Sequence, residues 1–498
     1  MSAMVIPLAA MPIKDWDSIN WKKVVAHVRL LQMRIAKAFR EGKRGKVKSL
    51  QRILTNSFYA KLLAVKRVTS NKGAKTPGID GVTWSTPTKK MKAARSIRRR
   101  GYKTKPLKRI YIPKKQKGKL RPLSIPTMDC RAQQALHLLS LEPISETVAD
   151  KNSYGFRPLR STADAIEHCF NALAQSRSSQ YILEGDIRSC FDQISHVWIE
   201  NNIFMDKSVL KKWLAAGYIE QNKFYPTTLG TPQGGIISPT ILNVTLSGLE
   251  QAIKAVVKRE DKVNVCIYAD DFIITGTTKE LLENKIKLVV EGFLKERGLT
   301  LSQEKTKISR IDEGFDFLGM NIRKYNGKLI IKPAKSSVKS FLVTIRDIIK
   351  RNKTCKTAEL IRQLNPKIRG WTNYYKHVCS KKTFSYVDRE IFAALWQWAV
   401  RRHPNKGKRW VRRNYFRSVI NRNWVFSAKT KDKYGNTINV DLVEAQKTPI
   451  RRHIKVKAAA TPYEAIYHEY YDKLIARRKI ATGSTTTNGG SQKEHVLG

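Results

Sequence analysis

Apolar residues recur every three or four positions along much of this chain, which is the period of an α-helix. Within residues 15–66 they form one stripe, made of Leu50, Ile53, Leu54, Phe58, Leu62 and Val65. A stripe of this kind is typical of a helix that buries one face. The same pattern predicts further helices over residues 128–142, 161–174, 236–257 and 279–297.

Shorter apolar runs that end at glycine or polar residues predict β-strands between these helices. One such run is Tyr181–Ile187. Two more, Val263–Tyr268 and Phe272–Thr275, stand on either side of the acids Asp270 and Asp271. The spacing predicts two strands joined by a tight turn with carboxylates at its tip.

A second hairpin is predicted upstream, where the runs Ile110–Pro113 and Arg121–Pro126 stand on either side of Lys117-Gly118-Lys119. Strands and helices mixed in this order predict an α+β fold, with helices covering one face of an antiparallel sheet. From about residue 333 the pattern becomes helical, and we expect a separate helical domain there. Residues 426–480 are mixed and basic, and residues 481–498 have the low-complexity composition of a disordered tail.

The charge of the chain indicates a polyanionic partner. There are 95 Lys and Arg against 40 Asp and Glu, a formal net charge of +55. Between Lys89 and Arg121 there are 16 basic and no acidic residues, and between Arg401 and Arg413 there are 7 and none. A solvated face would show the same runs. Interspersed apolar residues such as Tyr111 and Trp410 favour a folded nucleic-acid-binding surface instead.

Membranes and zinc are not expected partners. No apolar run approaches the ~20 residues of a spanning helix. The six Cys are scattered, and none has the Cys-x-x-Cys spacing of a zinc site. Unpaired thiols are typical of a cytoplasmic protein.

The acids at 270 and 271 have two interpretations. Asp is common in turns for conformational reasons alone. A third acid, Asp186, ends another predicted strand. Carboxylates that two strands bring together suit a pair of divalent cations ~3.5–4 Å apart, as in phosphoryl-transfer enzymes. Mg²⁺ prefers such oxygen ligands.

Several further segments agree with the second interpretation because of their order along the chain. In sequence order they are Thr76–Gly81, the Asp186 strand, Leu229–Pro239, Tyr268–Asp271, Gly298–Thr306, Gly314–Gly319 and Ile368–Tyr375. Each segment is a weak signal alone. Together they resemble the ordered motif blocks of group II intron-encoded reverse transcriptases, over roughly residues 15–480.

The resemblance implies a right-hand polymerase with fingers, a palm and an α-helical thumb, also called the maturase domain. The domains it implies are an RNA-binding N-terminal extension over 1–90, fingers and palm over 91–333, the helical thumb over 334–425, a basic DNA-binding region over 426–480 and a tail over 481–498.

The resemblance also implies site residues. Asp186, Asp270 and the backbone carbonyl of Ile187 would hold two Mg²⁺ ions, and Asp271 would complete the catalytic acids. The residues implied for the dNTP are Lys114, Arg121, Ile187, Phe191, Gln233 and Lys305, and among them Phe191 would exclude a ribose 2′-hydroxyl. Core packing for Phe191 and a surface role for Lys305 are the alternatives.

The basic residues that we expect to contact nucleic acid are Arg98, Arg99, Arg100, Arg401, Arg402, Arg409, Arg412 and Arg413. The partners implied are a group II intron RNA, a DNA target with its primer, and dNTPs. Many family members end in an endonuclease with paired Cys ligands, but no Cys follows Cys379. We therefore expect a bacterial member of the endonuclease-lacking type, in the cytoplasm at the nucleoid.

Two functions remain open from the sequence. The first is an RNA-directed DNA polymerase that also assists splicing and mobility of its intron, by target-primed reverse transcription. The alternative is an RNA-binding splicing factor with little polymerase activity. The three acids and Phe191 favour the first.

Overall fold

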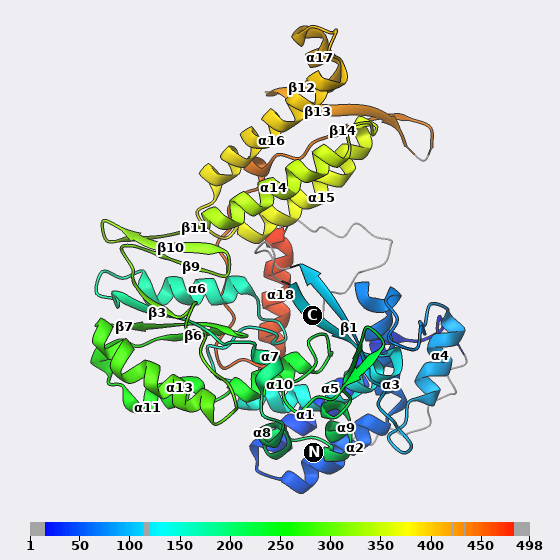
Figure 1. Cartoon of the computed structure of the whole chain (residues 1–498), viewed down its shortest axis with the longest axis vertical. Helices are drawn as coiled ribbons and strands as arrows, with labels where there is room; N and C mark the ends of the chain where they lie inside the picture. Colours follow the sequence, from blue (N-terminus) through cyan, green and yellow to red (C-terminus); the bar gives the residue numbers. More distant parts are fainter. Residues whose placement is uncertain (1–14, 114–119, 421, 433, 483–498) are drawn as a thin grey trace. The chain divides into compact units, whose positions relative to one another are not determined.

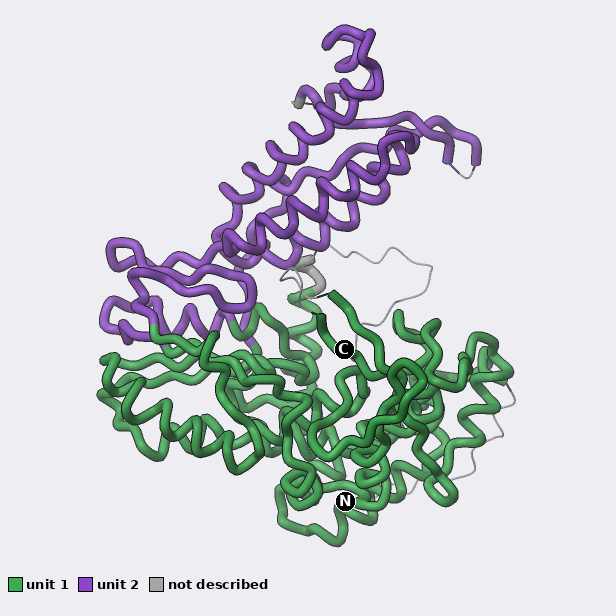
Figure 2. Tube along the Cα trace, viewed as in Figure 1, with its two compact units in different colours: residues 1–165, 183–308, 456–498 green, residues 166–182, 309–455 purple. Residues whose placement is uncertain are grey.

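The computed structural model describes residues 15–113, 120–420, 422–432 and 434–482, and Figure 1 labels many of its elements. The chain divides into two compact units, which Figure 2 shows in different colours. Unit 1 consists of residues 1–165, 183–308 and 456–498, and unit 2 of residues 166–182 and 309–455. Every helix in the described ranges is too short or too polar to cross a lipid bilayer. The expected tail over 481–498 lies almost wholly outside the described residues.

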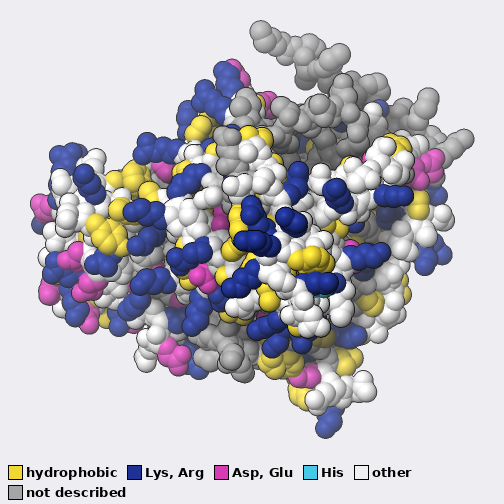
Figure 3. Space-filling model, turned by 90° about the horizontal axis from the view of Figure 1, so that it is seen from above, with side chains coloured by type: hydrophobic (Ala, Val, Ile, Leu, Met, Phe, Trp, Pro, Cys, Tyr) yellow, Lys and Arg dark blue, Asp and Glu magenta, His cyan; other side chains and the backbone are white. Residues whose placement is uncertain are grey.

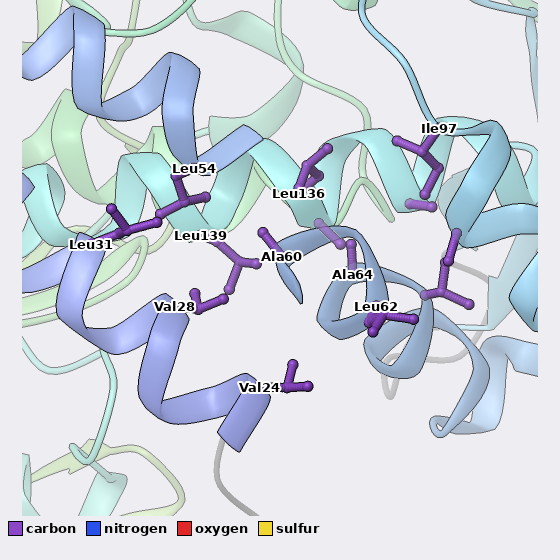
Figure 4. Packing of buried hydrophobic residues seen from close by; sticks show 14 of the residues in the cluster. Val24, Val28, Leu31, Leu54, Ala60, Leu62, Ala64, Ile97, Leu136 and Leu139 are labelled. Atoms are coloured by element: carbon purple, nitrogen blue, oxygen red, sulfur yellow. The ribbon is translucent and has the colours of Figure 1, made fainter. Parts of the chain in front are cut away.

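The N-terminal helices of unit 1 pack around one long buried helix. The elements are α1 Trp21–Arg40, α2 Arg44–Asn56, α3 Phe58–Thr69, α4 Pro87–Ser96 and the central helix α5 Met128–Val148. Their apolar faces share one core, in which Figure 4 labels Val24, Val28, Leu31, Leu54, Leu62, Leu136 and Leu139. The helices predicted over 15–66 and 128–142 are confirmed.

One position of the predicted stripe is wrong. Leu50 and Leu54 are buried in α2, but Ile53 is 54% exposed. The buried face of α2 includes Gln51 in its place, and the Gln51 side chain donates a 2.9 Å hydrogen bond to the Phe204 carbonyl. Because that bond satisfies the buried amide, the polar residue Gln51 can occupy this core position. The apolar pattern alone had predicted Ile53 to be buried instead.

A four-stranded sheet of order β2-β1-β4-β5 contains the upstream hairpin. Its strands are β1 Leu107–Pro113, β2 Leu120–Ile125, β4 Tyr218–Glu220 and β5 Lys223–Tyr225. Strands β1 and β2 are antiparallel, with Ile112 opposite Arg121. The paired strands of this hairpin are confirmed, and their connection, residues 114–119, lies outside the described residues.

A second four-stranded sheet, of order β6-β7-β3-β8, carries the predicted acids. Its strands are β3 Tyr181–Asp186, β6 Val265–Tyr268, β7 Asp271–Gly276 and β8 Lys307–Arg310. Strands β6 and β7 are antiparallel, with Tyr268 opposite Asp271. Both the predicted strand over 181–187 and the acidic hairpin are confirmed.

Short helices precede and follow these strands along the chain. They are α6 Thr162–Leu173, α7 Cys190–Gln193, α8 His196–Asn202, α9 Lys207–Leu214, α10 Ser238–Leu246, α11 Leu249–Val256, α12 Lys279–Leu281 and α13 Lys287–Lys295, with one π-helical turn, Leu282–Ile286, before α13. The helix predicted over 236–257 is broken at Gly248, whose φ is +94°. The Asp150 carboxylate accepts hydrogen bonds from the N–H groups of Gly248 and Glu250, so a residue distant in sequence caps α11.

Unit 2 combines helices with two small sheets. Its elements are β9 Phe315–Phe317, β10 Met320–Tyr325, β11 Lys328–Pro333, α14 Lys335–Arg351, α15 Thr357–Tyr375, α16 Lys381–Arg402, α17 Lys408–Tyr415, β12 Phe416–Val419, β13 Arg422–Lys431 and β14 Thr437–Asp441. Strands β12 and β13 begin inside the range that we expected to be helical. They form there because Phe416, Val425 and Phe426 are buried. The Phe426 ring packs with the rings of Trp398, Tyr415 and Phe416.

The chain returns to unit 1 at Val456. The fully buried Asp164 carboxylate accepts hydrogen bonds from the Val456 N–H and from Arg478 of helix α18 His468–Thr482. Arg160 donates to the carbonyls of Ala458 and Ala460. The range 426–480, which we expected to be one basic region, is therefore divided between the two units.

Candidate active site

Asp186 ends β3, and its neighbour Gly185 makes room for a buried ring. A methyl group at Gly185 would lie 2.2 Å from Cζ of Phe272, whose side chain is 1% exposed. The Phe272 ring therefore occupies the space that a side chain at 185 would need. This packing holds β3 against β7 beside the acid.

The hairpin between β6 and β7 presents two acids on a strained turn. Ala269 has a φ of 58°, in the left-handed region, which costs roughly 1–2 kcal/mol for a residue other than glycine. A methyl group at Gly155 would lie only 2.4 Å from the Ala269 nitrogen. The neighbouring Tyr154 N–H donates to the Ile267 carbonyl at 2.9 Å. Close packing from a second segment thus maintains a turn that would otherwise relax.

These two segments bring the acids together. The Ile187 N–H donates to the Asp270 carbonyl at 3.3 Å. The charge of Asp186 is among those that act on both Asp270 and Asp271. The Nζ atom of Lys305 lies 2.7 Å from Oδ2 of Asp186. Three carboxylates and one ammonium group therefore share one site.

The crowding of carboxylates changes their proton affinity. Desolvation by the surrounding protein, followed by the charge of Asp270, raises the pKa of Asp271 to about 7. Desolvation and then the charge of Asp186 also raise the pKa of Asp270, while Arg121 and Lys305 oppose that shift.

The donor set fits a hard divalent cation. In the described ranges, no group of three or more His, Cys, Asp or Glu side chains already has the spacing of a metal site. The chemistry nevertheless suits Mg²⁺, since the donors are carboxylate oxygens. The raised pKa values of Asp270 and Asp271 report negative charge that a bound cation would neutralise.

The segment that carries Lys305 is fixed to the same strand end. Leu301 forms a β-bridge with Ile187, and the Ser302 N–H donates to the Asp186 carbonyl at 2.8 Å. The Asp186 hydrogen bond and charge raise the pKa of Lys305. Backbone contacts therefore place the ammonium group, and the ion pair keeps it protonated.

Phe191 and Gln233 are connected through Asp192, which was not among the predicted site residues. Gln233 Nε2 donates to Oδ2 of Asp192 at 2.9 Å, and the Thr231 N–H donates to the Phe191 carbonyl at 2.6 Å. The ring of Phe191 meets that of Phe156 edge-on, with centroids 6.3 Å apart.

Asp192 had a signal in the sequence, because it is an acid directly beside the predicted aromatic. Phe156 had none. Its position results from a left-handed backbone, with φ at 57°, that leaves the ring 46% exposed next to Phe191.

Two candidates for binding the dNTP remain, Arg121 and Lys114, and only Arg121 lies within the described residues. Arg121 is exposed on β2, and its charge is among those that act on Asp270. Lys114 lies outside the described residues.

The basic residues predicted to bind nucleic acid fall into two groups. Arg98, Arg99 and Arg100 follow α4 in unit 1, where Arg99 forms an ion pair with Asp206. The others are on α16 and α17 of unit 2, namely Arg401, Arg402, Arg409, Arg412 and Arg413. The face of the molecule in Figure 3 carries many Lys and Arg and few Asp and Glu. Such a surface suits a phosphate backbone.

Three family models match the chain in sequence order. The N-terminal domain of reverse transcriptase matches residues 16–97, and the reverse transcriptase (RNA-dependent DNA polymerase) model matches residues 112–322. The group II intron maturase-specific domain matches residues 338–416. Protein YkfC of Escherichia coli (strain K12) is 32% identical over 322 residues, which are 55% of this chain and 82% of that protein.

The group II intron-encoded protein LtrA of Lactococcus lactis is 30% identical over 367 residues, which are 58% of this chain and 60% of LtrA. This chain belongs to the family of group II intron-encoded reverse transcriptases and maturases. A solved telomerase from Candida albicans is 12% identical, with a TM-score of 0.37, over 62% of this chain and 64% of that one.

Family membership agrees with the chemistry of the site. The reverse transcriptase match contains Asp186, Asp270, Asp271 and Lys305. The family's activity is RNA-directed DNA polymerisation, with nucleic acids as substrates and a dependence on divalent metal ions.

The pKa of Asp271 predicts a pH-dependent effect of removing its charge. The pKa of Asp271 is about 7 in the folded state, against a usual value of 3.8. Between these two pH values the folded state therefore binds more protons than the unfolded state does. The stability contributed by this group falls as pH rises through that window. Asp271→Asn cannot ionise. We expect its Tm in metal-free buffer to exceed that of the unaltered chain by about 2 °C or more at about pH 8, after allowance for screening. The excess should shrink towards about pH 5.

The control is Asp347→Asn, which removes an exposed carboxylate from α14. Its Tm difference should not depend on pH in this range. A Tm difference for Asp271→Asn that stayed constant, or that grew towards low pH, would contradict the assignment of crowded carboxylates.

Proposed function

We propose that this chain copies RNA into DNA at the site formed by Asp186, Asp270 and Asp271, and that it binds a group II intron RNA to assist splicing and mobility. The observation that carries the proposal is the convergence of three acids from two chain segments beside one lysine. A structural turn needs no such convergence. A metal-dependent polymerase site does.

The metal ions would be two Mg²⁺, held by the carboxylates of Asp186 and Asp270 and by the Ile187 carbonyl. Bound Mg²⁺ supplies activation of the attacking oxygen and neutralisation of phosphate charge. Asp271 adds negative charge at the same place, where it is under the influence of Asp186 and Asp270.

Basic side chains complete the electrostatics. Arg121 lies on the fingers hairpin, and we assign it to the triphosphate. Lys305 is held beside Asp186 and is positioned to neutralise charge on phosphate oxygens or at the primer end. Fixed charges of this kind lower the barrier because they need no reorganisation during the reaction.

Phe191 and Gln233 would select the incoming nucleotide. We assign Phe191 as the steric gate against a 2′-hydroxyl, with the Phe156 ring supporting it edge-on. Gln233 is oriented by its hydrogen bond to Asp192, and we assign it to the nascent base pair.

Nucleic-acid binding would involve both units. The N-terminal helices and the helical part of unit 2 lie in the segments that match the reverse transcriptase N-terminal domain and the maturase domain. We assign intron RNA to both, and a DNA target with its primer to the basic region after residue 425. With such partners, we propose that the protein acts at the nucleoid of a bacterial cell.

Primer extension tests the catalytic assignment. Asp270→Asn should reduce extension of a DNA primer on an RNA template with Mg²⁺ by roughly a hundredfold or more, because it removes a charged metal ligand. Affinity for the RNA template should not change, because phosphate contacts come from basic residues elsewhere.

Asp347→Asn is the matched control and should extend normally. If Asp270→Asn extended the primer as well as this control, the acid site would not be the polymerase site. If the unaltered chain bound RNA but extended nothing, the splicing-factor alternative would hold.

The steric-gate assignment has its own test. Phe191→Ala should raise incorporation of ribonucleotides relative to deoxyribonucleotides by about tenfold or more, because the ring no longer fills the space of the 2′-hydroxyl. Phe191→Tyr retains the ring and serves as the control. Single-nucleotide incorporation with dNTP and rNTP gives the ratio. An unchanged ratio in Phe191→Ala would end the assignment.

A further inference from the structure

Unit 2 contains a cavity of about 970 Å³ between helices α14 and α16. Its lining comes from these two helices and from the residues that directly follow each of them. This volume is in the range of pockets that enclose small organic ligands. None of the lining residues belongs to the acid site.

Part of the cavity lining, here called the floor, is apolar. It includes the buried side chains of Ile349 and Trp398 and the small side chains of Ala393 and Ala394. The Trp398 indole donates a 2.9 Å hydrogen bond to the Asn352 carbonyl, which fixes the orientation of the ring. Because Trp398 is only 5% exposed and the Arg402 guanidinium lies over its ring, a flat group in the cavity would stack on the guanidinium and pack against Ala393 and Ala394.

The rim of the cavity is cationic. Five lining residues are basic, namely Arg346, Lys350, Lys353, Arg401 and Arg402, and one is acidic, Glu390. Glu390 is already paired with Arg346 at 2.7 Å. The Arg402 guanidinium lies 4.5 Å from the Trp398 ring centroid and donates to the Cys355 carbonyl. The charge at the opening is therefore positive and is partly held in place.

We propose that this cavity binds one unpaired nucleotide of an RNA strand, with the base on the apolar floor and the phosphate at the rim. A lone phosphate would leave the floor unused, and an uncharged apolar ligand would leave the rim unused. A nucleotide uses both. Stacking of bases on aromatic rings or on Arg guanidinium planes is a general mode of single-strand recognition. The proposal rests on the RNA binding of the proposed function and adds a site to it.

The test fills the cavity without changing its charge. Ala393→Trp in the full chain should weaken binding of a fluorescent single-stranded RNA oligonucleotide by about tenfold, the loss typical of one stacked base. Binding of a blunt RNA duplex should not change, because paired bases cannot enter the cavity. The control Val343→Trp adds bulk at a 46% exposed position of α14 outside the lining, and it should bind both RNAs normally.

A second pair of variants tests the rim. Lys353→Glu reverses a charge at the cavity, and Lys367→Glu reverses an exposed charge on α15 that is not part of the lining. Lys353→Glu should weaken single-strand binding more than Lys367→Glu does. Equal losses of RNA affinity in the two variants would show that only long-range electrostatics is at work, and would overturn the proposed nucleotide site. Thermal unfolding of each variant shows whether it is folded.

Two further outcomes decide the proposal. If Ala393→Trp, once shown to be folded, weakened neither RNA or weakened both equally, the cavity would not be a nucleotide site. If adenosine monophosphate bound as tightly as the oligonucleotide, a free nucleotide rather than an RNA strand would be the occupant. Primer extension by the unaltered chain is independent of these results, so the polymerase assignment can stand while this proposal fails.

Discussion

Repulsion between carboxylates is the constraint on which the rest of this site depends. Desolvation and the charges of neighbouring carboxylates raise the pKa values of Asp270 and Asp271, and the ammonium group of Lys305 lies beside Asp186. An arrangement of this kind costs free energy in the absence of a cation. The surrounding fold must supply that energy, and the bound substrate and ions would recover it.

Close packing beside the acids supplies the free energy that holds the carboxylates together. The Phe272 ring fills the space above Gly185, and Gly155 allows a second segment to lie against the strained turn at Ala269. Each contact requires a glycine, since a methyl group there would overlap a neighbour. Backbone strain and unbalanced charge at one place are typical of functional sites, where local preferences give way to chemistry.

Much of this architecture could be predicted from the sequence, because strands and helices near the site have strong local patterns. The hairpin at 268–271 and the strand that ends at Asp186 are examples. What could not be predicted depends on distant partners. Asp150 caps the start of α11 at Gly248, about a hundred residues later in the chain. Asp164 binds the Val456 N–H, which lies nearly three hundred residues later. The side-chain packing of Phe156 against Phe191 likewise follows from a backbone conformation that no local pattern indicates.

The most direct test of the account is a crystal structure of the chain with a primer–template, an incoming nucleotide and Mn²⁺, a divalent cation that is located by its anomalous scattering. The account predicts two anomalous peaks between the carboxylates of Asp186 and Asp270, next to the α-phosphate of the nucleotide. Peaks bound elsewhere, or a primer end remote from these two acids, would contradict it.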